Sequence, residues 1–402
     1  MSGLDTPEPV PAGRRRRVLV VARMSPRLNA RTRRLVRSLS KAYDVRVICE
    51  KPRGLPPPDS GTAGHLVELE FSRKSGGRMH LRGLWRVLRL NAAGAWWVLS
   101  WRPDVVVCSD SLYVLPGAVA SLAFRAGFVY NSHEVMWGMD SPRWMTPALA
   151  WSEKHALRMA DAWMVPSEER RDLIHEYHGL SKPCLVVLNL PDPSQPGQEP
   201  LGFAGLRERL RALDRPIVMF QGSLQENRGL EALVELGRTG LVHVVIQGTG
   251  PHRGWAEKQA SDCVTVLPPC PGGETAAWLK LADLSFIWYP SGTLNEQWAC
   301  SNKLYASAFA HRPVLANRLP AFESFSSRYG GIWFFDSLES TSLHASVRSL
   351  LCTEGALLRL KREMAGAAKD LAIGDPDEDI RDAFRTWFPE KASGLRACQG
   401  AK

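Results

Sequence analysis

Short apolar runs alternate with amphipathic segments along most of the chain. The apolar runs are continuous stretches rich in valine and isoleucine, which is typical of parallel strands buried on both faces. The segments between them space their apolar side chains at helical intervals, as in residues 31–43 and 167–178. Regular alternation of strand and helix predicts an α/β protein. The expected strands are 18–24, 44–50, 65–71, 104–110, 128–134, 162–167, 216–222, 242–250, 263–269, 284–290 and 313–317.

The alternation is interrupted once, by a stretch rich in Pro and Gly at residues 191–202, and then restarts. We therefore expect two doubly wound Rossmann-like domains, residues 16–190 and 203–374, that face each other across a cleft. Residues 1–15 are polar and non-periodic and are expected to be a disordered tail. Residues 375–402 are expected to form a helix and tail that cross back to the first domain.

Composition narrows the class of protein. The chain has 402 residues, of which 45% are hydrophobic and 23% charged, as in ordinary globular proteins. It contains neither an apolar run long enough to span a membrane nor a recognisable signal peptide, so we expect a cytoplasmic protein. None of the eight cysteines is spaced as Cys-x-x-Cys, and no Asp-x-Asp pair ends a strand. Reduced thiols and no metal site are expected.

Positive charge is concentrated in the first quarter of the chain. Residues 1–103 hold 21 Lys and Arg against 7 Asp and Glu, whereas the whole chain has a net charge of +10. Such asymmetry indicates an anionic partner: a phosphorylated molecule, an acidic membrane or nucleic acid. No nucleic-acid reading motif is present, so we exclude nucleic acid.

Three loops of the second domain have the features of anion-binding helix starts, where free N–H groups and the helix dipole converge. The first, residues 221–230, contains Gly222, Ser223 and Arg228. The second contains Gly248 and Gly250, which allow close backbone approach. The third is Ser301-Asn302-Lys303, a helix cap followed by a cation. An acid at the end of the next strand, which a dinucleotide site requires, is missing, so a nucleoside diphosphate is the expected ligand.

His133 and Glu134 close the expected strand 128–134 of the first domain. This position lies at the carboxyl edge of the sheet and faces the cleft. A histidine there can hydrogen-bond a sugar hydroxyl or exchange a proton with an acceptor. A structural histidine that anchors its own loop is the alternative.

The order and spacing of these pieces resemble the GT-B glycosyltransferases, in particular the retaining nucleotide-sugar enzymes of family 4. The motifs that carry the resemblance include RLNARTRRLVRSLSKAYDVRVI, YNSHE, GSLQENRGLEAL, VVIQGTGP and SNKLYASAFAHRPVLAN. The similarity covers about residues 16–390. The resemblance implies the GT-B fold and transfer of a sugar from a nucleotide-diphosphate sugar, with a UDP-sugar favoured and no cofactor. It also implies retention of anomeric configuration without a metal ion.

The resemblance assigns roles to particular residues. His133 and Glu296 would act in catalysis, and Arg27, Arg31 and Glu134 would bind the acceptor. Two glutamates that are typical of the family fall on Trp298 and Ala306 here, so Glu296 is the nearest carboxylate to the first of them. The donor-binding residues would be Gly222, Ser223, Arg228, Gly248, Gly250, Ser301, Asn302, Lys303 and Leu304.

Two alternatives remain open at this stage. One is a nucleotide-sugar hydrolase or epimerase on the same fold, and the other is a degenerate GT-B module that binds an anionic surface. The acceptor would be a small molecule or a lipid-linked glycan. Arg82, Arg86 and Arg89 lie on one expected helix with Trp85, Trp96 and Trp97, a combination that suits peripheral contact with an anionic membrane.

Overall fold

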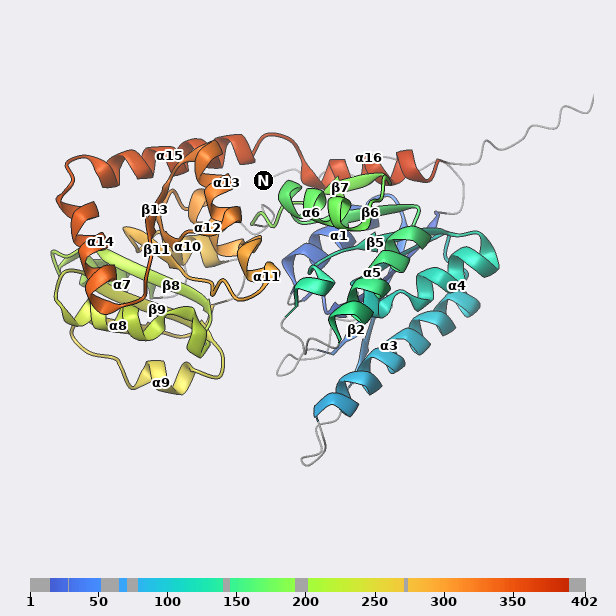
Figure 1. The fold of residues 1–402 in the computed structure, drawn as a ribbon, viewed down its shortest axis with the longest axis horizontal. Helices are drawn as coiled ribbons and strands as arrows, with labels where there is room; N and C mark the ends of the chain where they lie inside the picture. The colour runs from blue at the N-terminus through green and yellow to red at the C-terminus, as the bar shows by residue number, and fades with distance from the viewer. Residues whose placement is uncertain are drawn as a thin grey trace, which may run out of the picture.

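Two parallel sheets, each flanked by helices, form two domains that lie side by side in the computed structural model (Figure 1). The model describes residues 15–27, 29–51, 65–70, 79–139, 145–191, 202–270 and 274–389. The prediction of an α/β chain with two doubly wound domains is confirmed. The expected N-terminal tail and the expected linker fall almost entirely outside the described residues.

The first sheet has the strand order β3-β2-β1-β4-β5-β6-β7, with every pair parallel. The direction of winding reverses between β1 and β4, and ligands of such sheets bind at the carboxyl ends of the strands at this point. The strands are β1 Arg17–Met24, β2 Asp44–Glu50, β3 Leu66–Leu69, β4 Val105–Ser109, β5 Gly127–Asn131, β6 Ala162–Val165 and β7 Cys184–Val186. The helices are α1 Ala30–Ser40, α3 Met79–Trp101, α4 Leu115–Phe124, α5 Thr146–Met159 and α6 Glu168–His178, with short 3-10 helices η1 Ser111–Tyr113 and η2 Met136–Gly138.

The second sheet repeats this plan with the order β10-β9-β8-β11-β12-β13, so its winding reverses between β8 and β11. The strands are β8 Ile217–Ser223, β9 His243–Thr249, β10 Val264–Leu267, β11 Leu284–Ile287, β12 Val314–Asn317 and β13 Ile332–Phe335. The helices are α7 Phe203–Arg211, α8 Leu230–Arg238, α9 Arg253–Glu257, α10 Thr275–Leu279, α11 Leu294–Gln297, α12 Asn302–Phe309, α13 Pro320–Tyr329, α14 Ser340–Cys352, α15 Ala356–Leu371 and α16 Pro376–Trp387, with the 3-10 helix η3 Glu226–Arg228.

Consecutive residues of the central strands pack into different cores. Leu19 and Val21 of β1 join the core beneath α3 and α4, whereas Val18 and Val20 join the core beneath α1 and α16. All four side chains are completely buried. Burial on both faces explains why the strands appear in the sequence as unbroken apolar runs.

The last helix, α16, packs against the first domain although it follows the second in sequence (Figure 1). Ile380 and Phe384 are fully buried in the core beneath α1. Arg37 of α1 donates from Nε and Nη2 to the two carboxylate oxygens of Asp377, at 3.0 and 3.1 Å. The second domain is thus connected to the first at both of its ends.

The structure differs from the sequence expectations at several elements. Residues 318–374 received no expected element, yet they form α13, β13, α14 and α15. Strands such as β13 and β7 have only four and three residues, too few for a periodic pattern to be distinguished. The expected strand 128–134 ends at Asn131, so His133 and Glu134 lie in a bend beyond β5.

Two further observations concern membrane and redox chemistry. None of the helices in the described ranges combines the length and the apolar composition needed to cross a membrane. The seven cysteines in these ranges are free thiols. Burial raises the pKa of the Cys49 and Cys108 thiols to about 12, which leaves both as unreactive core side chains.

Candidate active site

Glycines at the ends of β8 and β9 allow unusually close packing at the edge of the second sheet. A Cβ on Gly222 (φ 136°) would lie 2.5 Å from Cε of Lys303. One on Gly248 (φ 154°) would lie 1.8 Å from the carbonyl oxygen of Gly222. The missing side chains therefore bring the two strand ends and the lysine together. Gly250 similarly packs on the backbone of Leu224, so this second loop serves strand packing.

Two cations, Lys303 and Arg228, share this edge. The ammonium group of Lys303, in the first turn of α12, lies 4.1 Å from the ring centroid of Phe220 and 6.0 Å from that of Tyr289. The guanidinium carbon of Arg228, in η3, lies 4.4 Å from the same Tyr289 centroid. Both positive charges thus lie beside one aromatic ring at the point where the second sheet reverses.

Neither cation is paired with a carboxylate within the described ranges. Arg228 donates weakly from Nε to Gln225 at 3.4 Å, and its buried Nη1 has no partner there. Burial and, secondarily, the charge of Arg228 lower the pKa of Lys303 to about 7. Two like charges held together without a counterion form a prepared site for an anion.

The remaining expected donor residues fall in different surroundings. Ser223 and Asn302 are exposed, at the end of β8 and the start of α12. Ser301 occupies the cap position of α12, but its hydroxyl makes no capping bond and instead accepts from the Tyr289 hydroxyl at 3.3 Å. Leu304 is buried in the core beside β12, so its side chain serves packing.

A cavity of about 200 Å³ lies between the edges of the two domains. His133, Glu134 and Arg31 line it from the first domain, and Asn302 lines it from the second. Three of the five side chains expected to act in catalysis or bind the acceptor are therefore brought together there, opposite the start of α12.

The imidazole of His133 is held as a neutral group. Asn131 lies with its amide Nδ2 3.0 Å from Nε2, so Nε2 is the acceptor and the proton resides on Nδ1. Burial, with the nearby charges of Arg31 and Arg170, lowers the pKa of His133 to about 3. The side chain thus offers a hydrogen-bond donor in a fixed tautomer at ordinary pH.

Asp110, which the sequence analysis did not assign, supports the His133 loop. Its carboxylate accepts the backbone N–H of His133 at 3.0 Å, and burial raises its pKa to about 6. Its backbone has φ 62° and ψ 151°, a region that costs a non-glycine residue about 1–3 kcal/mol. Asp110 follows β4, at the reversal point of the first sheet, and lines the cavity. The strained backbone of Asp110 therefore lies at the candidate ligand site.

The three residues expected to bind the acceptor differ in their protein partners and in whether they line the cavity. Arg31 is buried, donates to the carbonyl of Ser132 at 3.0 Å, and leaves Nε and Nη2 without partners in the described part of the chain. Glu134 is half-exposed and lies 3.7 Å from Arg170. Arg27 instead pairs with Glu68 at 3.3 Å and does not line the cavity.

Glu296, expected to be catalytic, caps its own helix. Its carboxylate accepts from the backbone N–H and the hydroxyl of Thr293, both at 3.1 Å, while the Thr293 hydroxyl accepts from the Glu296 N–H. This reciprocal capping box orders α11. The Thr-x-x-Glu spacing of this capping box is visible in the sequence.

Two residues that the sequence analysis did not single out, Asn295 and Arg170, form hydrogen bonds between the two domains at the site. Asn295 bonds both backbone groups of Val135, at 2.8 and 3.0 Å. The buried guanidinium of Arg170 donates to the carbonyl oxygens of His133 at 2.7 Å and Trp298 at 2.8 Å. The His133 loop is therefore attached directly to the segment that leads into α12.

Comparison with known proteins agrees with this geometry. Residues 28–191 match the model of the glycosyl transferase 4-like domain. A curated relative, the alpha-D-kanosaminyltransferase of Streptomyces kanamyceticus, is 34% identical over 121 residues. That alignment spans 28% of this chain and 31% of the relative.

Solved structures match the whole two-domain arrangement. Sucrose-phosphate synthase from Thermosynechococcus elongatus has a TM-score of 0.66 at 13% identity and covers 93% of this chain and 96% of its own. Anabaena HepE in complex with UDP-glucose has the same score and identity, over 92% and 98% of the two chains. A structure described as a UDP-N-acetylglucosamine 2-epimerase from Listeria monocytogenes scores 0.65 at 15% identity, over 94% and 97%.

These findings confirm the resemblance drawn from the sequence. Residues 28–191 match the glycosyl transferase 4-like model, and the chain as a whole shares the two-domain GT-B fold of these solved structures.

Proposed function

We propose that the protein is a glycosyltransferase that moves a sugar from a nucleotide-diphosphate sugar, preferably a UDP-sugar, to an acceptor in the first domain. The observation that carries the proposal is the unpaired Lys303–Arg228 couple beside Tyr289, at the reversal point of the second sheet. A similar fold binds UDP-glucose in Anabaena HepE. Two cations beside the leaving diphosphate would stabilise its developing charge without a metal ion. Retention of anomeric configuration rests on the family resemblance.

Donor turnover is the direct test of this proposal. The protein is incubated with a panel of nucleotide sugars, with and without a cell extract as the source of acceptor, and products are followed by mass spectrometry. A transferase releases nucleoside diphosphate from one donor and adds the sugar mass to an extract component. Release without an acceptor indicates a hydrolase. Binding without turnover of any donor, under either condition, indicates a degenerate module and contradicts the proposal.

Conversion of a UDP-sugar to its epimer is the second candidate, because the Listeria structure described as an epimerase matches this fold as well as the transferases do. The same experiment separates the two. An epimerase changes the donor to an isomer of equal mass with no acceptor present, which chromatography before mass spectrometry detects.

Donor affinity is expected to fall as pH rises above about 7. Lys303 is the cation below its pKa of about 7 and is neutral above it. A bound diphosphate stabilises the charged form of Lys303 and so raises its pKa in the complex. Donor affinity should therefore decrease gradually above pH 7, as binding requires Lys303 to take up a proton that the free protein has lost. UDP-glucose is a suitable probe because its phosphates stay ionised from pH 7 to 9. Lys303→Arg is the matched variant, since arginine remains charged throughout this range.

Calorimetric titrations at pH 7, 8 and 9 check this prediction. The wild type should lose affinity progressively, and Lys303→Arg should change much less. An equally steep loss in both proteins would contradict the assignment of the titrating group to Lys303.

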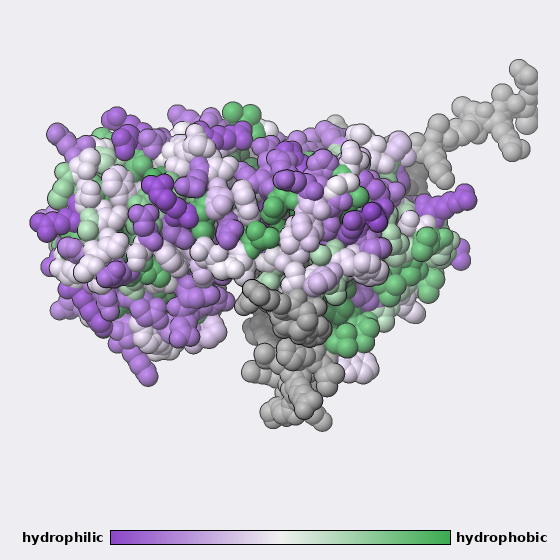
Figure 2. Space-filling view, in the orientation of Figure 1, coloured by the Kyte–Doolittle hydropathy of each residue, from purple (hydrophilic) through white to green (hydrophobic). Residues whose placement is uncertain are grey.

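We also propose that α3 of the first domain, the domain expected to bind the acceptor, contacts the membrane surface. Exposed apolar residues of this helix recur at helical spacing on one face, namely Trp85, Leu88, Trp96 and Leu99. Figure 2 shows apolar surface over α3 and neighbouring α4, where Leu122 is also exposed. A one-sided apolar face on a basic domain suits the interface of an anionic membrane and would bring a lipid-linked acceptor to a cytoplasmic enzyme.

We expect the protein to co-sediment with vesicles that contain anionic phospholipid and to be released by salt. The double variant Trp85→Ser/Trp96→Ser should lose most of the binding, because two exposed aromatic anchors are removed. The matched control is Trp151→Ser, an exposed tryptophan on α5. Equal sedimentation of both variants, or none of the wild type, would favour a soluble acceptor.

A further inference from the structure

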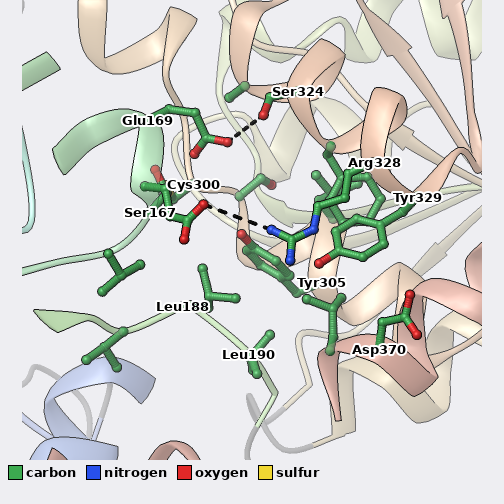
Figure 3. Close-up of a pocket in the computed structure, with 18 of the residues that line it drawn as sticks. Ser167, Glu169, Leu188, Leu190, Cys300, Tyr305, Ser324, Arg328, Tyr329 and Asp370 are labelled. Atoms are coloured by element: carbon green, nitrogen blue, oxygen red, sulfur yellow. Dashed lines mark hydrogen bonds and ion pairs between the residues drawn. The ribbon is translucent and has the colours of Figure 1, made fainter. Parts of the chain in front are cut away.

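A second and larger cavity, of about 500 Å³, lies at the junction of the two domains (Figure 3). It is bordered by α6 of the first domain, by residues 186–190, and by α12, α13 and α15 of the second. Leu188, Leu190 and Ser301 line it, whereas Asn189 and Asn302 line the smaller cavity at the candidate active site. The two cavities therefore lie on opposite sides of these two chain segments.

Negative charge predominates in this junction pocket. Its lining contains four carboxylates, Glu168, Glu169, Asp370 and Asp379, against the single cation Arg328. Arg328 lies 4.0 Å from Glu168, and both side chains of this pair are largely exposed. The other three carboxylates make no ion pair within the described ranges.

Further carboxylates lie close to Asp379 on α16, outside the lining of the pocket. Partial burial, together with the carboxylates of Asp375, Asp382 and Glu378, raises the pKa of Asp379 above its usual range. Glu169 has only the Ser324 hydroxyl as a side-chain hydrogen-bond partner in the described chain, at 2.5 Å. This region contrasts with a protein that carries a net charge of +10.

A buried tyrosine contributes an unused hydroxyl. Tyr305 of α12 is 8% exposed and lines the pocket, and Figure 3 shows its hydroxyl directed into the space beside Arg328. That hydroxyl makes no hydrogen bond with any described residue. The hydroxyl faces the cavity without a protein partner, so it is available to donate to or accept from a ligand there. Burial raises the pKa of Tyr305 far above its usual range, so it stays a neutral phenol.

We propose that the junction pocket binds a small organic amine with two or more ammonium groups, at a site separate from those of the donor and the acceptor. Ammonium groups would pair with Glu169, Asp370 and Asp379, and one N–H would donate to the Tyr305 hydroxyl. The cavity has the size of ordinary small-molecule sites. An anion is disfavoured because it would face the four carboxylates.

The position of the pocket gives the ligand a structural consequence. Glu168 and Glu169 come from the first domain, whereas Tyr305 and Asp370 come from the second. A diamine that contacts both sides would favour the domain arrangement in which these groups face each other. Occupancy of the pocket and the geometry of the active-site cleft are thereby linked.

Calorimetric titration of the full-length protein tests the proposal with three probes of similar size. Spermidine represents linear polyamines, 2-deoxystreptamine represents aminocyclitols, and myo-inositol is the uncharged control. We expect at least one amine to bind with a submillimolar dissociation constant and inositol not to bind. Which amine binds more tightly distinguishes the two sources of the ligand. Absence of binding by both amines, or equal binding of inositol, overturns the proposal.

Two variants locate the binding. Tyr305→Phe removes only the unpartnered hydroxyl, so it should leave the fold intact and weaken amine binding several-fold. Asp370→Asn should weaken it about tenfold, as loss of a charge-assisted bond does. Glu354→Gln, at an exposed turn, is the matched control. UDP affinity should be unchanged in all three, which separates this site from the donor site. Amine binding that both pocket variants leave unaltered contradicts the assignment.

Discussion

Replacement of His133 by alanine is expected to lower turnover about a hundredfold or more while leaving nucleotide affinity nearly unchanged. The imidazole lies in the cleft cavity opposite the donor domain, held neutral with its proton on Nδ1. A pKa near 3 keeps it in this form throughout the usual assay range, so the pH–rate profile should show no His133 titration between pH 5 and 8. Turnover of the best donor and calorimetric binding of UDP measure the two effects.

His175→Ala, at an exposed position of α6, is the matched control for this substitution and should be fully active. The structural alternative is that His133 only anchors its loop through Asn131 and Asp110. In that case the alanine variant would keep most of its activity, or would lose activity and thermal stability together. Either outcome would remove His133 from the reacting centre.

Removal of either donor-site cation is expected to weaken nucleotide binding about tenfold or more. A charge-assisted hydrogen bond contributes about 1.5–3 kcal/mol, and both Arg228→Ala and Lys303→Ala delete one such donor. Lys258→Ala, an exposed lysine after α9, is the matched control. Titration with UDP measures the affinities. Unchanged affinity in both variants would eliminate the Lys303–Arg228 couple as the diphosphate site.

The unfolding temperature of a Lys303 variant shows whether weaker nucleotide binding results from the lost charge or from a damaged fold. Lys303 and Arg228 repel each other without a counterion, so the uncharged variant Lys303→Met should unfold at the same or a higher temperature than the wild type at pH 6. Its stem keeps the packing on Gly222 and the Phe220 ring. A variant that binds nucleotide poorly yet is more stable fits a functional cation. A destabilised variant would indicate a structural one.

Much of the candidate site was readable because its signals are local. Arg228 and Lys303 lie at the edge of the second sheet, and the sequence indicates this position because each follows a strand end and lies at or beside a helix start. His133 was placed at the first sheet's edge for the same reason, although β5 ends two residues earlier than expected. Parallel strands expose their carboxyl ends together, so linear order along the chain predicts proximity in space.

Contacts between distant segments were not readable in this way. Glu296 looked like a cleft carboxylate, but the fold uses it to cap α11. Arg170 looked like one of several charges on an amphipathic helix, yet its guanidinium is buried and joins His133 to Trp298. Its partners lie 37 and 128 residues away, and no spacing rule indicates them.

The sequence by itself determined the architecture: two doubly wound domains, and the strand ends after which the cations and the histidine follow. These features follow from hydrophobic periodicity and helix-start chemistry, which act over a few residues. Only the tertiary structure decided which charges lack a partner. Burial of Lys303 beside Arg228, the neutral state of His133 and the free hydroxyl of Tyr305 depend on packing between segments far apart in the chain. Desolvation and pairing of charges are properties of that packing, so they emerge only when the domains are assembled.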